Sequence, residues 1–346
     1  VRRVSRSQQM KKSLSACVIL CAVVALFASC AGKKDQAQSS GEAKTWRIGV
    51  SKIVAHPALD ATEKGIQDEL AARGISAAWD LQNANGDVNT ATQIASKFKS
   101  EGADIIVAIA TPTAVAAVNA IKDRPVIFSV ITDPVGAGLV DSLDRGRGNV
   151  TGVSDMVNVL ANMTLFAKVA KIGTVGYIYT SSEANSASSL ADIEKACGQL
   201  GLKLIPQSIN NSSEVKQATE AILGRVDGLS RSTDNTVFSA LPSLVAVALA
   251  NKKPIFSSDT TSAMEGGCLI ASGFDYYKAG RATGSMVADV ISGKKPEEIP
   301  VKLLSPTEGD LLLDLDAAKT CGIEIPADVL AQASKIIENG KLTSKP

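Results

Sequence analysis

A repeated unit of apolar strand, polar loop and helix most constrains the fold of this chain. Residues 105–110 are apolar throughout, a polar cluster follows at 111–113, and an Ala- and Val-rich helical pattern comes next. Strands of this kind belong to sheets covered on both faces, and their alternation with helices implies right-handed βαβ units. Other apolar runs that end in polar clusters begin at Trp46, Val126, Val175, Gly228 and Pro254. The sequence therefore predicts an α/β fold with parallel sheets flanked by helices.

The unit occurs in two series, over about residues 46–156 and 170–275, without the tight sequence period of a repeat array. The length of the chain also suggests two domains. We predict a first lobe from 46–156 plus about 277–302, and a second lobe from 157–276 plus about 303–346. Ligands bind beyond the carboxyl ends of parallel strands, so the polar clusters of the two lobes are expected to face each other across a ligand cleft.

The C-terminal part of the chain predicts the elements that complete these lobes. A helical pattern covers 277–292, and the Pro-containing segment 294–306 is expected to carry the chain back between the lobes. A last helix, near 327–338, is expected to close the fold.

The N-terminal segment has the features of an export signal. Five basic residues precede an apolar run over 14–28, which is too short for a comfortable membrane span. We predict a signal peptide over residues 1–29, whether translation starts at Val1 or at Met10.

The apolar run ends in Ala28-Ser29-Cys30, which resembles the lipobox of bacterial lipoproteins. That resemblance implies cleavage before Cys30 and a lipid on its thiol, which would hold an exported protein on a bacterial membrane. An ordinary cleaved signal that leaves Cys30 as a free thiol is the alternative. Residues 30–45, rich in Lys, Gln, Ser and Gly, predict a flexible tether.

Composition argues against several classes of function. Residues 1–29 hold five of the 36 basic side chains and none of the 35 acidic ones, so the remainder is acidic and offers no nucleic-acid surface. With Cys30 lipidated, only Cys197, Cys268 and Cys321 remain, which allows at most one disulfide. His56 is the single histidine, and neither metal-ligand spacing nor a catalytic motif occurs. We therefore expect no metal, no cofactor and no enzymatic activity.

Polar residues at the expected strand ends suggest how a ligand could be held. Thr111 and Thr113 flank a Pro at the start of a helix, where free N–H groups and hydroxyls could bind a carboxylate. Asp133, Asp234 and Asp259 follow other strands and could bind an ammonium group. Together these groups would recognise an amino acid.

Each of these residues also has a purely structural interpretation. Thr111, Asp234 and Asp259 could cap helices, and Asp133 could form a turn before Pro134. His56 could be a polar loop residue. The pair Tyr276-Tyr277 could pack the lobes together instead of contacting a ligand.

Several motifs, in order along residues 46–340, resemble one family. They are residues 53–60 (IVAHPALD), 82–87 (QNANGD), 108–113 (AIATPT), 132–140 (TDPVGAGLV), 149–155 (NVTGVSD), 182–186 (SEANS), 233–236 (TDNT) and 273–277 (GFDYY). The family is that of the ABC-transporter substrate-binding lipoproteins that include tryptophan- and tyrosine-binding proteins. Two segments differ from its usual pattern: Ser230-Arg231-Ser232, and residues 156–163.

The resemblance implies a type I periplasmic-binding-protein fold, with two Rossmann-like lobes joined by three crossovers. It also implies a monomer that binds an amino acid, most often an aromatic one, and delivers it to a membrane permease with its ATPase. A nucleoside, a sugar or another small polar solute is the alternative ligand. The predicted ligand-binding residues are Ser51, Asn83, Thr111, Thr113, Thr132 and Asp133 from the first lobe, and Ser182, Glu183, Asn185, Asp234, Asn235 and Asp259 from the second.

Overall fold

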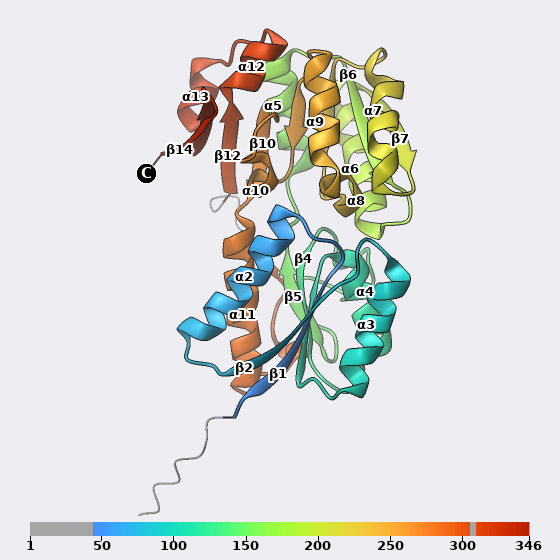
Figure 1. Cartoon of the computed structure of the whole chain (residues 1–346), viewed down its shortest axis with the longest axis vertical. Coiled ribbons are helices and arrows are strands. Elements are labelled where there is room, and N and C mark those ends of the chain that lie inside the picture. Colours follow the sequence, from blue (N-terminus) through green and yellow to red (C-terminus); the bar gives the residue numbers. More distant parts are fainter. Residues whose placement is uncertain (1–43, 305–308, 346) are drawn as a thin grey trace, which may run out of the picture. The chain divides into compact units, whose positions relative to one another are not determined.

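A computed structural model of the protein describes residues 44–304 and 309–345 (Figure 1). The predicted signal peptide, Cys30 and nearly all of the predicted tether lie outside these residues. Within the described ranges, no helix combines the length and the apolar character needed to cross a membrane.

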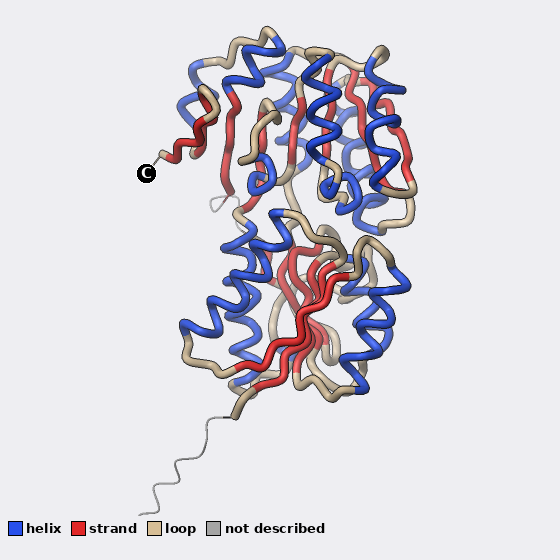
Figure 2. The backbone as a smooth tube through the Cα atoms, viewed as in Figure 1, coloured by secondary structure: helices blue, strands red, loops and turns tan. Residues whose placement is uncertain are grey.

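The first lobe is built on a sheet of six parallel strands in the order β11-β5-β4-β3-β1-β2. Its strands lie between layers of helices (Figure 2). Every residue of β3 and β4 is buried, as expected for strands that are apolar throughout. The elements of this lobe are β1 (Trp46–Lys52), α2 (Pro57–Ala72), β2 (Ala77–Asn83), α3 (Val88–Ser100), β3 (Ile105–Ile109), α4 (Thr111–Ala120), β4 (Val126–Ile131), β5 (Val150–Ser154), α11 (Tyr276–Ile291), a 3₁₀ turn (Pro296–Glu298) and β11 (Lys302–Leu303).

Two glycine-lined helices cover one face of this sheet, and α3 and α4 cover the other (Figure 1). Helices α2 and α11 come from opposite ends of the chain and approach closely through Gly65 and Gly280. A Cβ at Gly65 would lie 2.3 Å from the carbonyl oxygen of Tyr277, and one at Gly280 would lie 2.1 Å from that of Thr62. Only glycine permits this approach, and it fixes the late segment α11 to the first lobe.

The second lobe is built on a sheet of eight strands in the order β14-β13-β12-β10-β9-β8-β6-β7. All of its pairs are parallel except β10 with β12 and β13 with β14. Its elements are α5 (Val159–Ala170), β6 (Thr174–Thr180), α6 (Ala184–Leu200), β7 (Lys203–Ile209), a 3₁₀ turn (Ser212–Glu214), α7 (Val215–Leu223), β8 (Gly228–Arg231), α8 (Asn235–Ser239), α9 (Leu241–Ala250), β9 (Ile255–Ser257), α10 (Thr260–Ala263), β10 (Ile270–Phe274), β12 (Gly309–Asp314), α12 (Leu315–Cys321), α13 (Ala327–Gln332), β13 (Lys335–Glu338) and β14 (Lys341–Ser344).

The C-terminus corrects one expectation from the sequence. The helix expected near 327–338 ends at Gln332, and β13 and β14 then form an antiparallel hairpin. Asn339 and Gly340 connect the two strands with positive φ angles of 53° and 69°. An Asn-Gly pair in this conformation is the preferred two-residue hairpin turn, so local turn chemistry prevails over the helical spacing.

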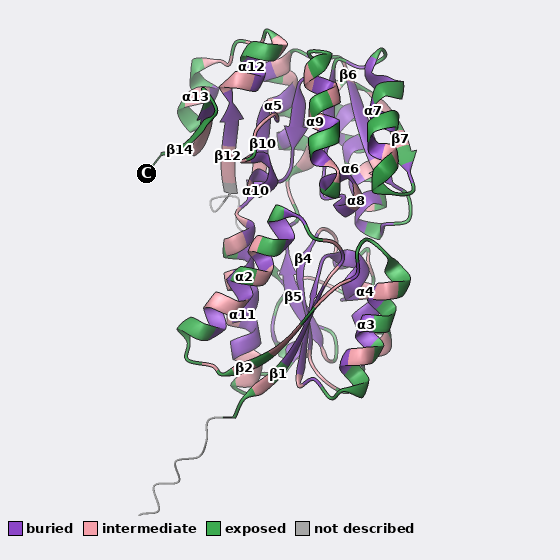
Figure 3. Cartoon of the chain, in the orientation of Figure 1, coloured by how far each residue is buried: buried purple, intermediate pink, exposed green. Residues whose placement is uncertain are grey.

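Buried apolar residues form separate cores within the two lobes (Figure 3). The core of the first lobe takes in residues 274–304 as well as the N-terminal part of the chain. The chain therefore crosses between the lobes after β5, after β10 and between β11 and β12. This is the type I periplasmic-binding-protein architecture with two parallel-dominated sheets. The loops after several strands of each sheet lie where the lobes meet.

Candidate ligand-binding site

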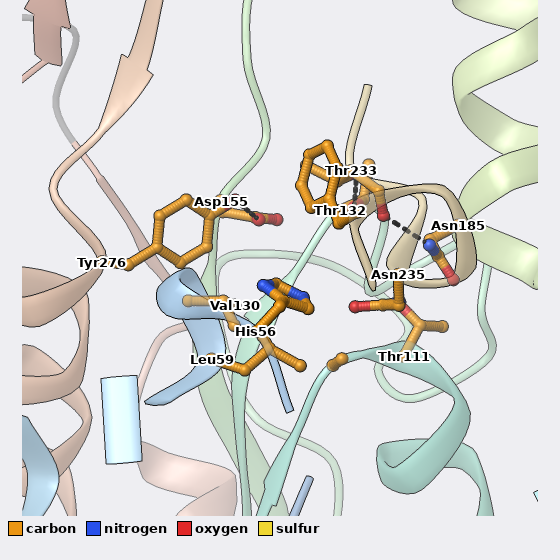
Figure 4. Close-up of a pocket in the computed structure, with 12 residues that line it drawn as sticks. His56, Leu59, Thr111, Val130, Thr132, Asp155, Asn185, Thr233, Asn235 and Tyr276 are labelled. Atoms are coloured by element: carbon orange, nitrogen blue, oxygen red, sulfur yellow. Dashed lines mark hydrogen bonds between the residues drawn. The ribbon is translucent and has the colours of Figure 1, made fainter. Parts of the chain in front are cut away.

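The carboxyl ends of strands from both lobes enclose a small cavity (Figure 4). Its volume is only about 10 Å³, the room of about one water molecule, so a larger ligand requires the walls to move apart. The lining residues come from loops or helix starts in both lobes: His56, Leu59, Ala110, Thr111, Val130, Thr132, Asp155, Asn185, Thr233, Asn235, Phe238 and Tyr276.

Two first-lobe residues that line the cavity have unusual backbone conformations. Ala110, between β3 and α4, has φ 76° and ψ 156°, a region that is nearly restricted to glycine. Val130, at an irregularity in β4, has φ 53°, which is a rare angle for a β-branched residue. Each such residue costs about 1–3 kcal/mol and persists only where the surrounding structure enforces it. Two of the six non-glycine residues with positive φ among the described residues therefore line this cavity.

On the second lobe, a buried carboxylate orients two amide side chains. Glu183 accepts hydrogen bonds from the Nδ2 atoms of Asn185 (3.1 Å) and Asn235 (2.7 Å), and from the hydroxyl of Thr236 (2.7 Å). Asn185 Nδ2 also donates to the carbonyl oxygen of Thr233. The carbonyl oxygen of the Asn185 side chain is left buried without a partner at the cavity. Glu183 thus orients Asn185, and the side-chain oxygen of Asn185 is the hydrogen-bond acceptor that faces the cavity.

Asp155, just after β5, adds a carboxylate to the wall. Its Oδ2 accepts a 2.8 Å hydrogen bond from the hydroxyl of Tyr276, and its Oδ1 has no partner. Burial raises the pKa of Asp155 to about 6, although the bond from Tyr276 favours the ionised form. Ionised Asp155 is therefore a buried charge that a cationic group in the cavity would stabilise.

His56 and Phe238 form an apolar part of the wall, one from each lobe. Their rings are in edge-to-face contact, with centroids 5.5 Å apart. Neither imidazole nitrogen has a hydrogen-bond partner among the described residues. Burial lowers the pKa of His56, the charge of Arg231 lowers it further, and the carboxylate of Asp259 opposes both effects. The imidazole is therefore neutral at pH 7 and offers one donor and one acceptor.

Direct contacts join the lobes at the rim of the cavity. The hydroxyls of Thr132 and Thr233 lie 2.6 Å apart, and Ser188 donates a 3.0 Å hydrogen bond to Asp133. The ring contact of His56 with Phe238 also crosses between the lobes. These contacts describe a closed cleft.

Of the twelve residues predicted from the sequence to bind ligand, four line the cavity: Thr111, Thr132, Asn185 and Asn235. The other eight lie outside its lining, and most of them have a local structural role. Thr113 donates to the carbonyl oxygens of Ile109 and Ala110, and Asn83 accepts from the backbone N–H of Asn85. Asp133 accepts from the backbone N–H of Gly136 and from the hydroxyl of Ser188. Glu183 orients the amide side chains of Asn185 and Asn235. Ser51 is buried in β1, and Ser182 is exposed.

Asp234 and Asp259, predicted to bind an ammonium group, are helix caps. Asp234 caps α8, and its two oxygens accept four hydrogen bonds, from Thr180 N, Thr180 Oγ1, Ser186 Oγ and Val237 N. Asp259 caps α10 through Oδ1, while its Oδ2 is buried without a partner. Donors within the protein therefore satisfy Asp234 fully, and Asp155 is the carboxylate that reaches the cavity.

Sequence reasoning passed over eight of the lining residues. The sequence also allows His56 as a loop residue and Tyr276 as lobe packing, and Asp155 stands in one of the motifs without being among the twelve predicted residues. Its position directly after a buried strand was the signal that could have found it. The others are Leu59, Ala110, Val130, Thr233 and Phe238.

The described residues contain no cluster of side chains suited to a metal ion. The thiols of Cys197, Cys268 and Cys321 are all free. Burial raises the pKa of each of these thiols, which makes them less reactive.

Comparison with known proteins places this geometry in a family. The model of the ABC transporter substrate-binding protein family matches residues 47–337. A tyrosine-binding protein of Clostridioides difficile (strain R20291) is 36% identical over 325 residues, which cover 91% of this chain and 93% of that protein.

Two solved structures are similar in sequence but differ in state. An ABC domain from Streptococcus pneumonia in complex with L-Trp is 34% identical, with a TM-score of 0.81 over 85% of this chain and 100% of its own. The ligand-free, open structure of an adhesive substrate-binding protein from Clostridium difficile is also 34% identical, over 85% of this chain and 99% of its own, but its TM-score is 0.63. At nearly equal identity and coverage, the backbone of the present structure therefore follows the L-Trp complex more closely than the ligand-free, open structure.

Proposed function

Because the chain belongs to the ABC transporter substrate-binding protein family, we propose that its cavity binds an aromatic amino acid. The observation that carries this proposal is the unpaired Oδ1 of Asp155, a buried carboxylate oxygen on a wall that also contains apolar and aromatic side chains. An α-ammonium group would supply the missing partner.

The acceptors of the cavity suit an ammonium group. Asp155 Oδ1 and the side-chain oxygen of Asn185 both lack a donor, and their burial excludes bulk water as a substitute. A cation paired with a buried carboxylate gains a charge-assisted hydrogen bond, which is stronger than a bond between neutral groups. Neutral sugars or nucleosides would leave the charge of Asp155 without a counter-ion.

The remaining wall suits an aromatic side chain. Phe238 and the neutral ring of His56 offer aromatic surfaces, and Leu59 and Val130 offer aliphatic ones. Aromatic rings gain both apolar burial and ring contacts in such surroundings. The names of the two relatives point the same way, since one is a tyrosine-binding protein and the other was crystallised with L-Trp.

The proposal includes how the protein acts in uptake. Closure of the lobes captures the amino acid outside the cytoplasm, and a permease with its ATPase receives it. The protein carries out no catalysis, acts as a monomer and is held on the membrane by a lipid on Cys30. The sequence of residues 1–30 supports the anchor, and mass spectrometry of the native protein tests it.

Isothermal titration calorimetry of residues 31–346 with L-tyrosine, L-tryptophan and L-phenylalanine tests the ligand. We expect one site per chain and a dissociation constant of about 1 μM or tighter, equivalent to about −8 kcal/mol. Adenosine and galactose serve as comparison ligands. Binding of either of these in place of all three amino acids would refute the proposed ligand and leave the family assignment intact.

A further inference from the structure

Arg231 is a buried cation behind the wall of the cavity. It is the last residue of β8, and its side chain is only 1% exposed, the largest fully buried side chain among the described residues. Strand β8 leads directly into Thr233, Asn235 and Phe238, three of the lining residues.

The guanidinium group has unused hydrogen-bonding capacity. Nη2 donates a 2.7 Å hydrogen bond to the hydroxyl of Ser257, but Nε and Nη1 have no partner among the described residues. Its ζ carbon lies 4.0 Å from the centre of the Phe238 ring, a cation–π contact that involves the face of the guanidinium group and leaves Nε and Nη1 available as donors. A buried cation that is left this way is costly, so its retention suggests that a partner arrives from outside the chain.

The surroundings of Arg231 place it within electrostatic range of the proposed ammonium site. The pKa of the Tyr276 hydroxyl is raised by burial first and by Asp155 and Asp259 next, whereas Arg231 lowers it. The charges of Arg231 and Asp155 therefore both affect the pKa of the Tyr276 hydroxyl. The stacked Phe238 ring connects Arg231 to the cavity wall, and the nearby Asp259 keeps an unpaired oxygen of its own.

We propose that Arg231 is the counter-ion for the carboxylate of the bound ligand and thereby a specificity-determining residue. The inference rests on the proposed function, and it identifies the ligand as one that carries a carboxylate beside its ammonium group. A guanidinium edge presents two parallel N–H groups that match the two oxygens of a carboxylate. An amine without a carboxylate leaves Arg231 unpaired and adds a second cation to the cavity.

Paired titrations with L-tyrosine and tyramine test this role, because the two differ only in the carboxylate. We expect the wild-type protein to prefer L-tyrosine by about 10- to 100-fold, the range for a hydrogen bond to a charged group. Arg231→Met should reduce this preference to within about threefold, chiefly because its affinity for L-tyrosine falls. Its affinity for tyramine should equal or exceed that of the wild-type protein. Arg225→Met, which removes an exposed arginine of the same lobe, should behave as wild type.

Two results would overturn the inference. One is a tyrosine-to-tyramine preference that survives in Arg231→Met. The other is an equal loss of both ligands together with a lower melting temperature, which would make Arg231 a structural residue. Without ligand, Arg231→Met removes an unpaired buried cation but also leaves the nearby buried carboxylate of Asp259 uncompensated. A lower melting temperature alone therefore does not decide the question, and the ratio of the two affinities does.

An acetate titration separates this inference from the proposed function. If no aromatic amino acid binds, the proposed ligand is wrong. The carboxylate site would still be supported if sodium acetate stabilised the wild-type protein and Arg225→Met but not Arg231→Met. Sodium chloride at equal ionic strength is the reference for each protein. An equal response of all three proteins would refute the carboxylate site.

Discussion

Replacing Asp155 by Asn should make the ligand-free protein more stable and should weaken its binding of the ligand. The substitution keeps the size of the side chain and an oxygen that accepts from Tyr276, but it removes the buried charge. Burial sets the pKa of Asp155 at about 6, against 3.8 for the free group. That difference corresponds to about 3 kcal/mol of stability lost when the carboxyl ionises in the native state.

The sign of the pH dependence follows from the raised pKa. Below about pH 3.8 the carboxyl is protonated in both states and contributes nothing. Between about 3.8 and 6 only the native state holds the proton, so the free energy of unfolding falls as pH rises, and it stays low above pH 6. Asp155→Asn should therefore gain up to about 3 kcal/mol at pH 7.5 and almost none at pH 4.

Urea unfolding without ligand at pH 4, 5, 6 and 7.5 measures this gain. Asp234, whose pKa burial and the neighbouring Glu183 also raise to about 6, leaves a residual slope of the same sign in the variant. Asp141→Asn, at a side chain that is 82% exposed, is the control and should match wild type. Calorimetry should show at least about a 30-fold loss of L-tyrosine affinity in Asp155→Asn. A variant that is less stable at pH 7.5, or that binds L-tyrosine as wild type does, would refute the reasoning.

Two further predictions concern closure and packing. Thr132→Val should remove the 2.6 Å hydrogen bond to Thr233 between the lobes and should therefore increase the rate of ligand release by about fivefold in stopped-flow displacement. An unchanged release rate would show that this bond contributes nothing to closure. Gly65→Ala should lower the free energy of unfolding by at least about 2 kcal/mol, because its Cβ would meet the carbonyl oxygen of Tyr277 at 2.3 Å. Gly198→Ala is the matched control, at an open position of α6, and it should be neutral or stabilising by up to about 1 kcal/mol. Equal destabilisation of both variants in urea would contradict the close approach of α2 and α11.

The fold was predictable because its strongest signals are local. Strands such as β3 and β4 are buried at every position, and uniform apolar character reports that burial directly. The C-terminal hairpin shows that two local signals can compete: helical spacing over 327–338 predicts a helix, whereas the Asn339-Gly340 turn favours the hairpin that the structure contains.

The site was less predictable because the role of a carboxylate depends on distant donors. Asp155 and Asp234 both follow strands, and the sequence alone does not distinguish them. Asp234 is satisfied by Thr180 and Ser186, which lie 54 and 48 residues away in the chain, while one oxygen of Asp155 stays unpaired. Tertiary contacts therefore decide which of the two is available to a ligand.

The unpaired groups of the cavity also bear on why the lobes close around a ligand. Without ligand, the closed cleft buries an unpaired oxygen of Asp155, the nitrogens of His56 and part of the Arg231 guanidinium. An open cleft would give the polar groups access to water, so closure is unfavourable until a ligand supplies their partners. A ligand shifts the equilibrium only by its differential affinity for the closed state. A solute that lacks either the ammonium or the carboxylate group would leave one of these charges buried and unpaired, and the open state would then be favoured.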